Sequence, residues 1–162
     1  MKHAFIGIGS NLGDRQKNCV EAVEKLKQLR GCEFIRCSRW YLTSPVRVED
    51  QNWFVNGVLC LDVEISAREL LKSLLSIEAG MGRVRTEKWG PRVIDLDLLL
   101  YGTDIVNEED MKIPHPYMHL RRFVLAPLAE VGPDVIHPVL GKTVSQMLQE
   151  LQAEDQQVTL LE

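Results

Sequence analysis

The sequence predicts an α+β fold in which an antiparallel sheet is covered by helices. The hydrophobic patterns follow one another as strand, helix, two strands, helix and strand. A short connection joins the two middle strands, as in a hairpin, which makes them antiparallel. The chain has 162 residues, the size of one domain with a substantial core. We therefore expect a single domain over residues 1–162.

The chain opens with a strand followed by an amphipathic helix. Residues 5–8 are apolar apart from one glycine, and we expect the strand to stop in the glycine-rich segment 9–13. Apolar residues at three-to-four spacing then predict a helix over 15–29. The glycine-rich segment lacks the ending and the spacing of a phosphate-binding glycine loop. A tight turn, with Asn11 or Asp14 capping the helix, explains the segment adequately.

Two strands and a second helix form the middle of the chain. Residues 33–43 are rich in aromatic and apolar side chains and are predicted to form one strand. Ser66 and Glu69 form a capping box, which predicts a Leu-rich helix from there through Ile77. Between them, residues 54–65 are predicted to form a strand with these apolar residues on one face: Val55, Leu59, Leu61, Val63 and Ile65.

A further strand and two helices follow. Residues 93–101 are predicted to form a strand, with turn residues directly behind it. Residues 121–131 have a helical pattern that must accommodate Pro127, so this helix should be short or kinked. Thr143 and Gln146 form a second capping box, at the start of a terminal helix. This order of elements is that of a ferredoxin-like sandwich.

Charge and cysteine content argue against several classes of protein. The chain has 23 acidic and 19 basic residues, a formal net charge of -4, whereas a general nucleic-acid binder is usually basic. Its four cysteines show no CxxC spacing, which argues against a zinc site and favours reduced thiols in the cytosol. No segment has the apolar length of a signal-peptide core or a membrane span. We expect a cytoplasmic protein that binds neither nucleic acid nor a membrane.

Two carboxylates on one strand are the strongest chemical signal. Side chains alternate along a strand, so Asp95 and Asp97 should point to one face while the apolar residues beside them face the core. Neighbouring carboxylates repel each other, and a hard divalent cation relieves that repulsion. Two solvated residues at a strand edge are the alternative, although Asp is a poor strand former. The pattern favours a magnesium site that bridges substrate phosphates.

Basic residues gather just before this strand. Phosphoryl transfer needs cations that neutralise charge on the phosphate oxygens, and Arg does so through paired hydrogen bonds. Glycines at both ends of the segment suggest a loop able to close over a substrate. A solvated basic loop is the alternative for any single member. With the two carboxylates, the cluster predicts a phosphate site; its members are Arg83, Arg85, Lys88 and Arg92.

Two further pairs are compatible with ligand binding. Phe54 and Asn56 lie one strand repeat apart, where a ring and an amide could stack on and hydrogen-bond a flat heterocycle. A core Phe and a turn Asn are the alternative.

His115 lies between two prolines, and with Arg121 it could contact a nucleotide phosphate. A lone His is more often structural.

Six motifs occur in one order along the chain: 9–14 (GSNLGD), 54–56 (FVN), 82–85 (GRVR), 89–92 (WGPR), 95–97 (DLD) and 114–116 (PHP). This series resembles the 6-hydroxymethyl-7,8-dihydropterin pyrophosphokinase family of folate biosynthesis, from Phe5 to about Val139. The run from 82 to 97 is its most specific part. The resemblance implies a ferredoxin-like fold and transfer of pyrophosphate from MgATP to the hydroxymethyl group of a reduced pterin, with AMP as coproduct.

The resemblance also implies roles for the matching residues. Asp95 and Asp97 would hold two Mg²⁺ ions, and Arg83 and Arg92 would stabilise the transferring group. Phe54 and Phe123 would stack on the two faces of the pterin ring, and Asn56 would hydrogen-bond its polar edge. Backbone contacts to the pterin would come from Thr43, Ser44, Pro45 and Val46. The nucleotide side would include Glu78, Arg85, Trp89, His115 and Arg121. The implied ligands are ATP and the reduced pterin, and we expect a monomer.

Two other interpretations were open on sequence grounds. A nucleotidyltransferase also pairs a Gly-Ser with an Asp-x-Asp, but there the two motifs lie close in sequence, whereas Ser10 and Asp95 do not. A ferredoxin-like RNA-binding or ligand-sensing module would show exposed aromatic residues on its first and third strands and a basic surface. The predicted first strand has one aromatic residue, and the chain is acidic. Failure to consume ATP with any pterin would favour the non-enzymatic module.

Overall fold

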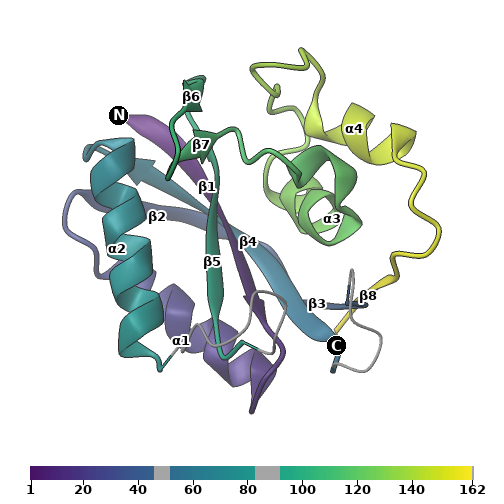
Figure 1. Ribbon diagram of the computed structural model, residues 1–162, viewed down its shortest axis with the longest axis horizontal. Coiled ribbons are helices and arrows are strands. Elements are labelled where there is room, and N and C mark those ends of the chain that lie inside the picture. Colours follow the sequence, from purple (N-terminus) through teal and green to yellow (C-terminus); the bar gives the residue numbers. More distant parts are fainter. Residues whose placement is uncertain (46–51, 83–91, 162) are drawn as a thin grey trace.

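In the computed structural model, which describes residues 1–45, 52–82 and 92–161, a six-stranded antiparallel sheet forms the centre of the molecule. Along the sheet the order is β5-β1-β4-β3-β8, and β2 pairs with β4 as well (Figure 1). The strands are β1 Lys2–Ser10, β2 Cys32–Cys37, β3 Tyr41–Thr43, β4 Phe54–Val63, β5 Asp95–Tyr101 and β8 Val158–Leu160.

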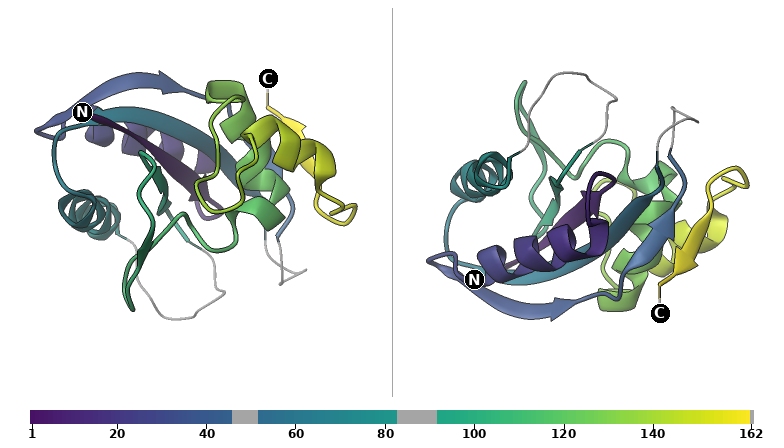
Figure 2. Two further views of the ribbon diagram at one scale, coloured as in Figure 1. Left: turned by 90° about the horizontal axis from the view of Figure 1, so that it is seen from above. Right: turned by 90° about the horizontal axis from the view of Figure 1, so that it is seen from below.

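Two pairs of helices enclose separate cores on the two faces of the sheet. On one face, Ile6, Leu59 and Leu74 belong to a core formed with α1 and α2. On the other face, Phe5, Val58 and Leu125 belong to a core formed with α3 and α4. Figure 2 shows the two pairs on opposite sides of the view. The helices are α1 Arg15–Lys27, α2 Ala67–Gly80, α3 Arg122–Val131 and α4 Val144–Glu150.

A small hairpin and a single 3₁₀ turn connect β5 to α3. The hairpin consists of β6 (Val106–Asn107) and β7 (Lys112–Ile113), and the turn is η1 (Met118–Leu120). Arg68 of α2 forms ion pairs with Glu108 and Asp110, so the hairpin is fastened to the α2 side. No helix in the described ranges has the length and apolarity needed to cross a bilayer.

The predicted fold class is confirmed. β1, α1, the β2–β3 segment, β4, α2 and β5 follow the ferredoxin-like order, and every pairing in the sheet is antiparallel. Both predicted helix starts are capped, but one of the two capping boxes is complete and the other is not. Thr143 and Gln146 form a reciprocal box, whereas the Ser66 hydroxyl accepts the Glu69 N–H and contacts the Glu69 carboxylate instead of that carboxylate accepting the Ser66 N–H. α3 is short and contains Pro127, as expected.

The first strand is longer than predicted. We expected it to end before the glycine-rich segment, but β1 continues through Gly9 and Ser10, which pair with Asn56 and Val55 of β4. Glycine weakens an isolated strand, but here the ladders to β4 and β5 hold both sides of β1. Of the two candidate caps of α1, Asp14 fills the role, since its carboxylate accepts the Lys17 N–H.

The segment 33–43 forms two strands instead of one. The ladder with β4 is interrupted at Ser38, whose hydroxyl accepts the Val58 N–H at 2.9 Å in place of a backbone carbonyl. Trp40 lies over Gly57, where a Cβ would come within 2.5 Å of the indole ring. A serine that substitutes for a backbone acceptor and a bulky ring therefore separate β2 from β3.

Candidate active site

The site is built around two glycines of the central strand β1, Gly7 and Gly9, which have no side chains to fill the space above the sheet. Gly9 of β1 lies between Asn56 of β4 and Asp95 of β5, and Gly7 lies between Val58 and Asp97. A Cβ on Gly9 would approach the Asn56 Nδ2 to 2.5 Å, so a larger residue does not fit there without moving Asn56. The two glycines therefore leave an open floor between β4 and β5.

A cavity of about 700 Å³ lies over this floor in the described part of the chain. Its wall includes residues from β3, β4, α2, β5, the β6–β7 hairpin and the start of α3. The volume lies in the upper part of the range for pockets that hold drug-sized ligands. The lining brings together these predicted site residues: Thr43, Ser44, Pro45, Phe54, Asn56, Glu78, Arg92, Asp95, Asp97, His115, Arg121 and Phe123.

The predicted alternation along β5 is confirmed. Asp95 and Asp97 are half-buried on one face of β5, whereas Leu96 and Leu98 are buried in the core with α1 and α2 on the other; all four contribute to the cavity wall. The register with β1 then shifts, which leaves Leu99 without a partner in the ladder. This bulge ends the alternation, because Leu99 and Leu100 both lie in the core of α3 and α4.

Arg92 lies at the carboxylate end of the cavity. Its Nη1 is 4.0 Å from the Asp95 Oδ1. The Arg92 N–H donates to the Asn11 side-chain oxygen at 2.7 Å, and the Arg92 carbonyl accepts the Asn11 N–H at 3.0 Å. Asn11 had been considered only as a helix cap. Its role at the site was missed because nothing in the sequence links it to a residue so distant along the chain.

Glu78 is attached to the strand that carries the carboxylates. It is 3% exposed, and its Oε2 accepts the Leu96 N–H at 2.8 Å. Leu96 lies between Asp95 and Asp97, so this hydrogen bond fixes the backbone of that segment from the α2 side. Glu78 also lines the cavity, and its predicted contact with a nucleotide stays a prediction.

The amide of Asn56 is oriented by its neighbours. The Thr43 hydroxyl donates to the Asn56 Oδ1 at 2.5 Å, and the Asn56 Nδ2 donates to the Ile8 carbonyl at 3.4 Å. Ser44, next to Thr43, is held by hydrogen bonds with Gln157 in both directions. An amide fixed in this way presents a defined donor and acceptor pattern to a ligand.

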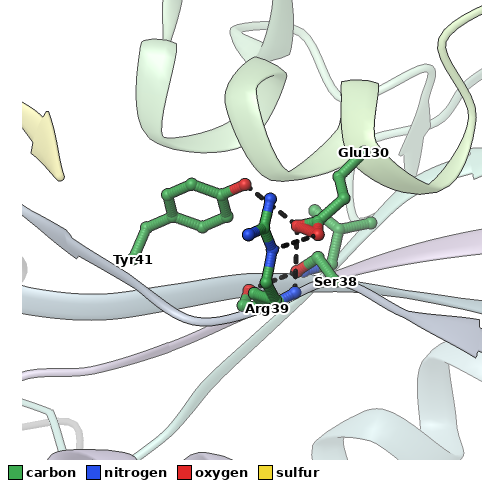
Figure 3. A network of polar contacts seen from close by, with 5 residues as sticks. Ser38, Arg39, Tyr41 and Glu130 are labelled. Atoms are coloured by element: carbon green, nitrogen blue, oxygen red, sulfur yellow. Dashed lines mark hydrogen bonds and ion pairs between the residues drawn. The ribbon is translucent and has the colours of Figure 1, made fainter. Parts of the chain in front are cut away.

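Phe123 approaches the cavity from the first turn of α3. The Arg121 guanidinium lies 5.5 Å from the centre of its ring. Figure 3 shows how this helix is joined to the sheet: Glu130 accepts hydrogen bonds from the Arg39 Nε (2.8 Å), the Arg39 N–H (3.0 Å) and the Tyr41 hydroxyl (2.9 Å). Because Tyr41 belongs to β3, this network sets α3 against the strand that carries Thr43.

His115 is a neutral hydrogen-bonding group at physiological pH. Burial lowers its pKa to about 4, the positive charge of Arg121 lowers it as well, and Asp95 opposes this effect. Its Nδ1 accepts the Tyr117 N–H at 3.2 Å, so the proton of the neutral ring lies on Nε2. His115 can therefore donate a hydrogen bond from Nε2.

Five predicted residues lie outside the described residues: Val46, Arg83, Arg85, Lys88 and Trp89. Within the described ranges, no group of three or more His, Cys, Asp and Glu side chains could hold a metal ion by itself. Two carboxylates nevertheless fit Mg²⁺, which keeps several water ligands and is commonly shared between protein carboxylates and substrate phosphates. The donor set of Asp95 and Asp97 therefore fits the predicted ion.

A ferredoxin-like sheet with carboxylates, an arginine and a neutral histidine around one cavity defines a class of protein, the transferases that hold nucleotide phosphates beside an acceptor. The chain matches the family model of 7,8-dihydro-6-hydroxymethylpterin-pyrophosphokinase (HPPK) over residues 5–133. The chain belongs to this family. It is thus an ATP-dependent pyrophosphokinase of folate biosynthesis that acts on hydroxymethyldihydropterin, as the sequence predicted.

Individual relatives agree with the family match. The chain is 43% identical over 148 residues to a 2-amino-4-hydroxy-6-hydroxymethyldihydropteridine pyrophosphokinase of Synechocystis, a match that covers 91% of this chain and 75% of the relative. It is 42% identical over 151 residues to the protein of the same name from Methylorubrum extorquens, covering 93% and 94%.

A solved structure resembles the fold. The wild-type HPPK-DHPS of Plasmodium falciparum matches with a TM-score of 0.73 at 14% identity. The match covers 92% of this chain and 44% of that chain, so the similarity concerns less than half of the Plasmodium protein.

Proposed function

We propose that the cavity transfers the pyrophosphoryl group of MgATP to the hydroxymethyl oxygen of 6-hydroxymethyl-7,8-dihydropterin and releases AMP. One observation carries the assignment of the site: Asn56 and Asp95 lie on either side of Gly9 in one row across the sheet. A heterocycle read by the amide would therefore lie next to phosphates held at the carboxylates. Such proximity is what a direct transfer between two bound substrates requires.

Asp95 and Asp97 would hold two Mg²⁺ ions. Bound there, the ions would neutralise charge on the phosphate oxygens of the nucleotide. The protein contributes the placement of the two carboxylates, which the ladder with β1 and the hydrogen bond from Leu96 to Glu78 hold at one face of β5.

The pterin would be bound at the Asn56 end of the cavity. Phe54 and Phe123 would stack on the two faces of its ring, and Asn56 would hydrogen-bond its polar edge. Support comes from Thr43, which fixes the Asn56 amide, and from the Glu130 network, which fixes α3 against β3. Backbone contacts would come from Thr43, Ser44, Pro45 and Val46, of which Val46 lies outside the described residues.

The phosphates would be bound at the other end. Arg92 would stabilise the transferring group, His115 would donate from Nε2, and Arg121 would add positive charge. Glu78 would contact the nucleotide side, as would Arg85 and Trp89, and Arg83 would assist Arg92. Arg83, Arg85 and Trp89 lie outside the described ranges.

The charge at this end favours attack on the β-phosphorus. The hydroxymethyl oxygen forms a bond to that phosphorus and loses its proton, while the bond from the β-phosphorus to the oxygen shared with the α-phosphate breaks, and AMP departs. Negative charge then develops on the leaving α-phosphate and persists on the transferred group. The Mg²⁺ ions that Asp95 and Asp97 would hold, together with Arg92, would compensate this negative charge at both places.

We also propose that the chain acts as one domain over residues 1–162, as a monomer in the cytoplasm. The four cysteines are free thiols. Burial is the main reason that the pKa of Cys19 is raised to about 12, which keeps this thiol protonated and unreactive. Four free thiols, of which Cys19 and Cys60 are buried, are compatible with a reducing compartment.

The test is product analysis. The protein is incubated with MgATP and the reduced hydroxymethylpterin, quenched and separated by chromatography. We expect AMP and a pterin diphosphate in equal amounts without ADP as an intermediate. A pterin that lacks the hydroxymethyl group serves as the control and should yield no AMP. ADP as the sole nucleotide product would refute the pyrophosphokinase mechanism and leave the magnesium site in place.

A further inference from the structure

Asn11 joins three parts of the chain at the edge of the cavity. Its backbone N–H donates to the Arg92 carbonyl at 3.0 Å, and its Oδ1 accepts the Arg92 N–H at 2.7 Å. Its Nδ2 donates to the Asn52 carbonyl at 3.4 Å. Asn11 is 1% exposed, so its own donor and acceptor groups are shielded from solvent, which strengthens its hydrogen bonds to these partly exposed partners.

The turn that contains Asn11 has its own support. Asp14 caps α1, and Asn18 of α1 donates from Nδ2 to the Leu12 carbonyl at 2.9 Å and to the Ser10 hydroxyl at 3.3 Å. The Asn11 side chain, in contrast, bonds to segments far away in the sequence. Its conformation therefore serves the contact between segments more than the turn.

We propose that Asn11 is a positioning residue for pyrophosphoryl transfer, because its side-chain amide fixes the backbone of Arg92 and so the direction in which the guanidinium enters the cavity. This inference rests on the catalytic role proposed for Arg92. The side chain of Arg92 already reaches the carboxylate end, with Nη1 4.0 Å from the Asp95 Oδ1. A displacement of about 1 Å at such a group is enough to lower a rate about 100-fold.

The bond to Asn52 extends this role to the pterin end. Asn52 lies just before β4, the strand that begins with Phe54, and Arg15 donates to the neighbouring Trp53 carbonyl at 2.7 Å. One buried amide thus holds the backbone that carries Arg92 and the backbone that leads into β4. Asn11 therefore fixes the position of the phosphate end of the cavity relative to the pterin end.

The first test compares Asn11 with Asn18, the asparagine of α1 whose side chain supports the same turn. Asn11→Ala removes the side-chain bonds and keeps the backbone bond to the Arg92 carbonyl. We expect kcat to fall about 10- to 100-fold, while KM for ATP and for the pterin changes less than about threefold. Asn18→Ala is the matched control, because it loosens the turn without touching Arg92; it should lower the melting temperature and leave kcat unchanged.

A conservative variant separates the two side-chain bonds. Asn11→Asp keeps an acceptor for the Arg92 N–H and loses the donor to Asn52, so it should retain a kcat several-fold above that of Asn11→Ala. If Asn11→Ala does not fold, the kcat of Asn11→Asp relative to the unmodified protein tests the proposal in its place. Equal losses in the two folded variants, or a kcat for Asn11→Asp below that of Asn11→Ala, would overturn the assignment of the Arg92 contact.

A double-mutant cycle decides whether Asn11 acts through Arg92. In the Arg92→Ala background, adding Asn11→Ala should cost less than about twofold in kcat, because the group that Asn11 positions is gone. Multiplication of the two single losses would overturn the proposal, as would a loss in Asn18→Ala equal to that in Asn11→Ala. An unchanged kcat in Arg92→Ala alone would remove the catalytic role of Arg92, and this inference with it, which distinguishes the two failures.

Discussion

The two faces of β1 come from alternating residues of one short segment, yet they form opposite environments. Towards α1 and α2, Ala4, Ile6 and Ile8 are at most 1% exposed and belong to a closed core. On the opposite face, Gly7 and Gly9 line the cavity and place no side chain in it. Burying an isoleucine contributes about 1.5–3 kcal/mol, whereas each glycine in a strand costs about 0.5–1 kcal/mol. The three apolar residues stabilise the fold, whereas the two glycines on the other face give up stability to leave room for ligands.

The largest expected effect separates the two faces on a single strand. Asp97→Ala should lower kcat at least about 100-fold and leave the free energy of unfolding nearly unchanged, because Asp97 lies on the cavity face. Leu98→Ala should instead cost about 2–5 kcal/mol of unfolding free energy, because the Leu98 side chain is buried in the core formed with α1 and α2. Steady-state kinetics and urea unfolding measure both quantities. Near-normal activity of Asp97→Ala at saturating magnesium would contradict the metal assignment.

A smaller effect should follow from adding a methyl group at either glycine of β1 that lines the cavity. Gly9→Ala places a Cβ 2.5 Å from the Asn56 Nδ2 and must displace the amide, so we expect pterin affinity to fall at least about tenfold. Gly7→Ala meets only an ordinary contact of 3.5 Å with Leu99 and should weaken pterin binding less. Titration calorimetry compares the two variants. Equal losses would mean that volume, and not the Asn56 amide, determines pterin affinity.

The proposed ring sandwich predicts a still smaller change. Phe123→Ala should remove about 0.5–1.5 kcal/mol of stacking in addition to buried area, and so weaken pterin binding several-fold while ATP binding changes less. Leu125→Ala is the control, since this side chain is buried in the core of α3 and α4, does not line the cavity and should affect stability instead. An equal loss of affinity for both ligands in Phe123→Ala would count against the sandwich.

The smallest effect concerns the pH dependence of stability. The pKa of His115 is about 4 in the folded protein against 6.5 as its ordinary value. Between these values the unfolded chain binds a proton that the folded chain does not, so the free energy of unfolding falls as the pH falls. This contribution is at most about 1.4 kcal/mol per pH unit. His115→Asn should therefore flatten the slope.

Urea unfolding between pH 4.5 and 7 measures this slope in both proteins. His137, whose pKa burial and His119 also lower, is present in both and does not affect the difference. Identical slopes would show that His115 does not titrate as its burial requires.

The sequence predicted much of this arrangement because several of its signals are local. The capping box at Ser66, the cap at Asp14 and the alternation around Asp95 and Asp97 each depend on residues a few positions apart. These signals gave the element order and placed both carboxylates on one face. The contact of His115 with a phosphate was predicted from its position between two prolines and near Arg121. The position of Phe123 at the cavity was predicted from the family resemblance alone.

The misses have non-local causes. Gly9 indicated a turn by propensity, but pairing with β4 and β5 keeps it in a strand. The break at Ser38 depends on its bond to the Val58 N–H, and the role of Asn11 depends on bonds to Arg92 and Asn52. Hydrogen bonds across such sequence separations leave no periodic pattern. The sequence therefore located the reacting groups better than the residues that hold them.

The hydrogen bond between Glu78 and Leu96 has a consequence for solubility. β5 lies at the end of the described sheet, and a strand in that position can pair with a strand of another molecule. Here Glu78 occupies the Leu96 N–H, and the His115 N–H occupies the Leu99 carbonyl. The contacts that hold the Asp-bearing strand in place therefore also block two of the groups through which this edge could recruit another chain into an aggregate.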